Sequence, residues 1–81
     1  MQDVPPRMPV SSIRPGPQYW MGRLEYGEGK EWVDHYRVMI RCGLYIPPIK
    51  IDQRHFIVDG HHRYQAHVLE GKTEINTRRA W

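Results

Sequence analysis

The stretch Ile57-Val-Asp-Gly-His-His-Arg-Tyr64 decides the fold, because the pattern of its side chains changes halfway along it. Residues 55–58 form a short, mostly apolar run that is typical of a strand. After Gly60 the apolar side chains fall on one helical face, and Gly71 ends that pattern. Gly60 allows a backbone turn that other residues resist. The sequence therefore predicts a strand, a tight turn at Gly60 and then a helix.

This turn is a candidate anion site. A helix that starts at His61 or His62 directs backbone N–H groups and a partial positive charge toward its N-terminus. Arg63 adds a planar, permanently charged fork that suits phosphate, and both histidines can donate hydrogen bonds or move protons near neutral pH. Asp59 is a candidate N-cap or magnesium ligand. The alternative is that Asp59 only caps the helix while the histidines are solvated, and the residues alone favour neither.

A second helix is predicted between Lys30 and Cys42. Apolar side chains recur there at spacings of three and four residues, from Trp32 to Ile40, which defines an amphipathic helix. Gly43 follows, and glycine at this place permits the left-handed residue that closes many helices.

The remaining regular segments are expected to be strands. The two prolines of Ile46-Pro-Pro-Ile-Lys-Ile51 limit backbone donors, so a strand is expected to begin only near Ile49. A turn follows this strand, which favours a hairpin with the next strand. An extended arm over residues 1–9 leads into the first strand. The expected strands are 8–13, 49–52, 55–58 and 73–81. These elements predict a single α+β domain over residues 1–81, with a short mixed sheet and two main helices.

Residues 14–30 are predicted to form a long loop, because they are rich in Gly, Pro and aromatic residues and have no periodicity. Loops longer than about 12–15 residues in compact domains are usually functional or disordered. Tyr19, Trp20 and Tyr26 argue against disorder. The loop is either a lid or recognition loop, or its aromatic side chains simply cover the edge of the sheet.

Composition sets the class of protein. A chain of 81 residues with a net charge of +3 and a pI near 9.3 favours anionic partners without identifying nucleic acid. The single cysteine, Cys42, excludes an internal disulfide and a Cys-rich zinc site. We find neither a leader sequence nor a run of roughly 20 apolar residues, so we expect a cytoplasmic protein without membrane contact.

Several segments, taken in order, resemble the ParB/sulfiredoxin superfamily. They are Pro48-Ile-Lys-Ile51, Phe56-Ile-Val-Asp-Gly-His-His-Arg-Tyr-Gln-Ala66 and Glu70-Gly-Lys-Thr-Glu-Ile75, with Met8-Pro-Val-Ser-Ser-Ile-Arg-Pro15 similar to the first strand. In that superfamily a strand, a Gly-x-x-Arg turn, an Ala-bearing helix and a following Gly recur in this order. Its members bind the phosphates of a nucleotide at the turn and helix start. The resemblance implies this role for Gly60, His61, His62 and Arg63.

The chain also departs from the best-known members. Sulfiredoxins carry a catalytic cysteine where His61 stands, and Cys42 lies on the other helix, so we do not expect sulfinic acid reduction. Partition-type ParB proteins carry Glu and Arg where His61 and His62 stand, together with a helix-turn-helix domain for which this chain has no room. The Asp-Gly-His-His-Arg version is similar to members that act as small-molecule kinases or have unknown activity.

The leading hypothesis is therefore nucleotide binding, with ATP, ADP or CTP as the ligand and with NTP hydrolysis or phosphoryl transfer as the reaction. Asp59, His61 and His62 are the candidate catalytic residues of the turn. Asp59, or a carboxylate such as Glu28 or Glu31, would place Mg²⁺ or act as the base.

Two alternatives use other features. A DNA-binding or nuclease module would use the same phosphate site, with further contacts from Arg14, Arg23, Arg78 and Arg79. A protein-interaction or inhibitor protein would keep the fold without activity and present Trp20, Tyr26 and Trp81 to its partner.

Overall fold

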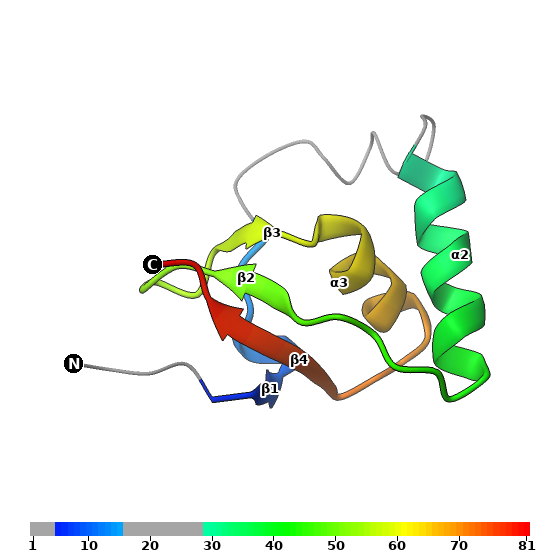
Figure 1. Ribbon diagram of the computed structural model, residues 1–81, viewed down its shortest axis with the longest axis horizontal. Coiled ribbons are helices and arrows are strands. Elements are labelled where there is room, and N and C mark those ends of the chain that lie inside the picture. Colours follow the sequence, from blue (N-terminus) through cyan, green and yellow to red (C-terminus); the bar gives the residue numbers. More distant parts are fainter. Residues whose placement is uncertain (1–4, 16–28) are drawn as a thin grey trace.

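The computed structural model describes residues 5–15 and 29–81 (Figure 1). The elements in chain order are β1 (Arg7–Pro9), the 3-10 helix η1 (Val10–Ser12), α2 (Gly29–Arg41), β2 (Ile49–Ile51), β3 (Ile57–Asp59), α3 (His61–Leu69) and β4 (Glu74–Arg79). The predicted change from strand to helix at Gly60 is confirmed. Both predicted helices are present, and left-handed glycines follow them, with φ of 70° at Gly43 and 68° at Gly71.

The strands form one mixed sheet in the order β1-β4-β2-β3. β4 pairs antiparallel with β1 and parallel with β2, and β2 and β3 form the predicted antiparallel hairpin. Alternate side chains on β2 and β4 are buried, and the fully buried ones are Ile49, Ile51 and Ile75. The sheet is therefore apolar on one face, and that face must be covered.

Helix α3 covers the sheet, and α2 packs on α3, so α3 lies between the sheet and α2 (Figure 1). Two groups of buried side chains result. The first joins the strand isoleucines to Met8, and the second joins Val33 and Ile40 of α2 to Ala66 of α3. Tyr64 packs against both groups, so it links the two layers of the core. No helix in the described part of the chain is long and apolar enough to cross a membrane.

The N-terminal segment differs from its prediction. Arg7–Pro9 is a strand rather than part of an extended arm, because Met8 is buried beside Ile75 of β4. The predicted strand over 8–13 is wrong beyond Pro9, because the chain turns there into η1. The N–H of Val10 donates to the carbonyl oxygen of Thr73 at 2.9 Å. Arg14 then pairs with Phe56 in an isolated bridge, so the predicted loop over 14–30 is paired at its start. Residues 16–28 of that loop lie outside the described residues.

The hairpin turn also shifts one strand boundary. Asp52 Oδ1 accepts hydrogen bonds from the backbone N–H groups of Arg54 and Phe56, at 2.8 and 2.9 Å. This side-chain turn places His55 in a left-handed conformation, with φ of 70°. β3 therefore begins at Ile57 rather than at His55.

Glu70 joins the two helices where α3 ends. Its carboxylate accepts hydrogen bonds from Arg41 Nε and Nη2, at 2.8 and 2.9 Å, and from Arg37 Nε at 2.7 Å. The guanidinium groups of Arg41 and Arg37 lower the pKa of Glu70 from 4.5 to about 2. The side chain is only 11% exposed. This contact ties α3 to the C-terminal half of α2, and the two helices run in the same direction (Figure 1).

Replacing Glu70 with glutamine is expected to lower the Tm at neutral pH, because the amide cannot form the charge-assisted bonds. The pKa of Glu70 is depressed in the folded state, so its contribution to stability is complete above about 4.5 and is lost as the pH falls toward about 2. The difference in Tm between wild type and Glu70→Gln should shrink over that range in thermal unfolding. Glu74→Gln is the matched control, because Glu74 is 58% exposed and 3.7 Å from Arg7. A constant difference across the range would contradict the prediction.

Candidate functional site

Gly60 occupies the turn between β3 and α3 because no other residue fits there. It has φ of 112° and ψ of 25°, a left-handed conformation that costs other residues free energy. A Cβ atom at this position would lie 2.5 Å from Cγ2 of Ile49, which is fully buried on β2. Both the backbone and the packing therefore require glycine, whether or not a ligand binds.

Gly60 is also the N-cap of α3, and as a glycine it has no side chain that could form a capping hydrogen bond. The first helical hydrogen bond runs from the N–H of Tyr64 to the carbonyl of Gly60, at 2.9 Å. The N–H groups of residues 61–63 precede it and lie at the positive end of the helix. The alternative that Asp59 caps the helix is wrong, because the left-handed Gly60 takes the cap position one residue later.

Arg63 is held beside Gly60 by oxygen atoms of its own chain. Nη1 donates to the carbonyls of Pro47 and Pro48, at 3.4 and 3.3 Å, and Nη2 donates to Asp59 Oδ2 at 3.3 Å. The side chain is 14% exposed. A guanidinium group has five N–H donors, so two of them remain for a ligand. Arg63 therefore fixes the segment before β2 and can still contact an anion at the turn.

The two histidines follow Gly60 and are half-buried. Burial, together with the charge of His62, lowers the pKa of His61, although the carboxylate of Asp59 opposes this shift. His61 is therefore mainly neutral at neutral pH. A neutral imidazole can accept a proton from a hydroxyl group or from water, which suits a general base.

Asp59 has a cationic neighbour that the sequence reasoning missed. Its side chain is 67% exposed, and Lys50 is its partner across β2 and β3. The register of the predicted hairpin could have identified Lys50. In residues 5–15 and 29–81 there is no group of three or more His, Cys, Asp or Glu that could hold a metal ion. Mg²⁺ often takes one or two carboxylates with phosphate oxygens and water, so Asp59 stays a candidate ligand for nucleotide-bound magnesium.

The other candidate residues are not gathered at the turn. Glu31 lies in the first turn of α2, at the same end of the parallel helices as Gly60, but it makes no hydrogen bond or ion pair with the described residues of the turn. Cζ of Arg14 lies 5.6 Å from the centre of the Phe56 ring, next to β3. Arg78 and Arg79 are exposed on β4, which lies on the other side of the β2–β3 hairpin. The predicted residues outside the described part of the chain are Trp20, Arg23, Tyr26 and Glu28.

The element order, the four-stranded mixed sheet and the turn at the end of β3 define an α+β domain with the ParB/sulfiredoxin-like fold. Two solved structures are similar to it, each with a TM-score of 0.69. One is a Pnob8-like ParB-N domain, with 12% identity over 96% of this chain and 30% of that chain. The other is sulfiredoxin from Arabidopsis thaliana, with 22% identity over 98% of this chain and 84% of that chain.

These identities show the fold alone, and the chain spans less than a third of the length of the ParB-N protein. No protein-family model matches the sequence, and none of the curated proteins matches it. The fold is therefore shown by the structure alone, and the chemistry of the candidate site depends on the residues of the turn.

Proposed function

We propose that the β3–α3 turn binds the phosphate groups of a nucleoside triphosphate or diphosphate. The observation that supports this most strongly is Gly60 at φ of 112°, which leads into a helix N-terminus whose N-cap residue has no side chain. Backbone N–H groups and the helix dipole favour an anion at such an end. Arg63 lies beside the same glycine, with its Nη2 3.1 Å from the position of a Cβ on Gly60.

Each residue of the turn has a part in this proposal. The N–H groups of residues 61–63 and the two remaining donors of Arg63 would bind phosphate oxygens. Asp59 would hold Mg²⁺ together with the phosphates, and Lys50 opposite it would offset negative charge. For hydrolysis or phosphoryl transfer, the neutral imidazole of His61 would act as the base, with His62 and Glu31 as the other candidates.

Titration calorimetry with ATP, ADP and CTP, with and without Mg²⁺, tests the proposal. We expect saturable binding that adenosine, which lacks phosphate, does not reproduce. Asp59→Asn should remove the part of the affinity that depends on Mg²⁺. The matched control is Asp34→Asn, because Asp34 is an aspartate on α2 whose side chain is 49% exposed and paired with Lys30.

The proposal fails if none of the three nucleotides gives heat. It also fails if adenosine binds as tightly as ATP, because the base rather than the phosphates would then provide the affinity. Nucleotide binding without turnover would leave the phosphate site standing and would exclude hydrolysis under those conditions.

A further inference from the structure

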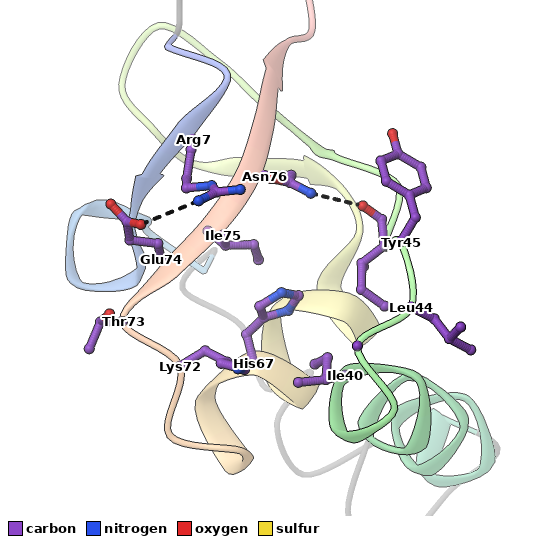
Figure 2. Close-up of a pocket in the computed structure, with 12 residues that line it drawn as sticks. Arg7, Ile40, Leu44, Tyr45, His67, Lys72, Thr73, Glu74, Ile75 and Asn76 are labelled. Atoms are coloured by element: carbon purple, nitrogen blue, oxygen red, sulfur yellow. Dashed lines mark hydrogen bonds and ion pairs between the residues drawn. The ribbon is translucent and has the colours of Figure 1, made fainter.

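A second polar site lies where the C-terminal half of α3 faces β4. There a cavity of about 470 Å³, open to solvent, is lined by the end of α2, the 43–46 segment and the first half of β4 (Figure 2). It shares no lining residue with the turn at 59–63. Its lining includes the charged or polar side chains of Arg7, His67, Lys72 and Asn76 and the apolar side chains of Ile40 and Ile75.

His67 is the buried polar group of this cavity, at 7% exposure. Its Nδ1 lies 2.6 Å from the carbonyl oxygen of Arg63. A carbonyl only accepts, so Nδ1 carries the proton and Nε2 is a hydrogen-bond acceptor. Burial lowers the pKa of His67, which keeps the ring neutral. Figure 2 shows the ring directed into the cavity, where Nε2 has no hydrogen-bond partner among the described residues.

Asn76 supplies a second acceptor. Its Nδ2 donates to the carbonyl of Ile46 at 3.1 Å, which fixes the orientation of the amide. Oδ1 is left as an acceptor on a residue that lines the cavity. Acceptors such as this atom and His67 Nε2 favour a ligand that donates hydrogen bonds, and hydroxyl groups do so without adding charge.

The charge of the cavity favours an anion. Lys72 and Arg7 are cationic, and Glu74 is the one acidic side chain that lines it. Arg7 is paired with Glu74 at 3.7 Å, whereas Lys72 has no ion pair within the described ranges. The C-terminal carbonyl groups of α2 and α3 carry partial negative charge, but loop N–H groups donate to them. The N–H of Leu44 donates to the carbonyl of Met39, and the N–H of Lys72 donates to the carbonyl of His67. Lys72 therefore gives the cavity an excess positive charge.

We propose that this cavity binds a small hydroxylated anion, with a hydroxyl group on His67 Nε2 and the anionic group near Lys72. Ile40 and Ile75 provide an apolar wall for the carbon chain. The anion is a carboxylate or a phosphate monoester, which share the same charge and acceptor chemistry. The proposal does not depend on nucleotide binding at the turn.

Nuclear magnetic resonance titration of the whole chain with a three-carbon series tests this. Glycerate and glycerol 3-phosphate carry both features, glycerol lacks the anion and propionate lacks the hydroxyl groups. We expect saturable shifts of the His67 ring and of the amides of residues 72–76. Propionate should bind about two- to tenfold more weakly than glycerate, because it has no hydroxyl group to donate a hydrogen bond to Nε2. Whichever of glycerate and glycerol 3-phosphate binds more tightly identifies the anionic group.

Lys72→Gln should weaken glycerate binding about threefold, the loss typical of one exposed charge. Lys30→Gln is the matched control, because Lys30 is an exposed lysine on α2 that lines neither the cavity nor the turn. The proposal is overturned if no compound gives saturable shifts, if the shifts are confined to residues 60–63, or if the two lysine variants behave alike. Shifts at 60–63 bear on the phosphate site of the turn instead, so the two proposals fail separately.

Discussion

Gly60→Ala is expected to lower the free energy of unfolding by about 2–5 kcal/mol. The left-handed backbone costs an L-residue roughly 1–2 kcal/mol, and forcing a methyl group into a packed core costs typically 1–3 kcal/mol. The methyl group would meet Cγ2 and Cβ of Ile49, at 2.5 and 2.9 Å, and Ile49 has no room to move because it is fully buried. This loss is a large part of the roughly 5–15 kcal/mol that stabilises a small domain.

Gly43→Ala separates the two causes. Gly43 has φ of 70°, but no atom lies within 4 Å of a Cβ placed there. We therefore expect it to lose only the backbone part, about 1–2 kcal/mol. Urea unfolding of both variants measures the difference. If both variants lose the same free energy of unfolding, the contact with Ile49 relaxes without cost and the turn tolerates a side chain.

Arg63→Ala is expected to cost both stability and affinity. Removal of the guanidinium takes away the hydrogen bonds to the carbonyls of Pro47 and Pro48 and to the carboxylate of Asp59. Water can replace the donor at the exposed acceptors, so the free energy of unfolding should fall by about 0.5–1.5 kcal/mol. Loss of a charge-assisted contact to phosphate should weaken nucleotide binding about 10- to 100-fold. Arg63→Lys keeps the charge, but one ammonium group cannot bond to the oxygens of Pro47, Pro48 and Asp59 together. We therefore expect its stability and its nucleotide affinity to lie between those of wild type and Arg63→Ala.

Arg54→Ala is the control for the loss of a positive charge. Arg54 is exposed in the β2–β3 turn, and only its backbone N–H takes part in a hydrogen bond with the described residues. Urea unfolding and calorimetry with ATP should leave this variant close to wild type. A folded Arg63→Ala protein that binds ATP as tightly as wild type would remove Arg63 from the phosphate site while leaving its structural role intact.

The elements with a strong local pattern could be predicted from the sequence. The stripe from Trp32 to Ile40 and the glycines after both helices fix the helical layer, and the prolines before Ile49 delay β2. The first strand could not be placed, because Val10 looks as suitable for a strand as Met8. Only the burial of Met8 against β4 decides where pairing stops.

The turn that carries the candidate site could be predicted in position, but its contacts could not. Gly60 at a change from strand to helix is visible in the sequence, as is an arginine three residues later. That Arg63 bonds to the carbonyls of Pro47 and Pro48 depends on how α3 packs against the segment before β2. The acceptor role of His67 depends in the same way on three segments that are distant in sequence.

The segment of residues 46–48 has a consequence for both sites. Its three successive carbonyls are bound by side chains from two different elements: Asn76 of β4 holds the first, and Arg63 of α3 holds the other two. Two consecutive prolines restrict the backbone of this segment before the chain folds, so little entropy is lost when it is fixed. The segment thus acts as a stiff spacer of constant length, which sets the separation between the turn at Gly60 and the cavity beside His67.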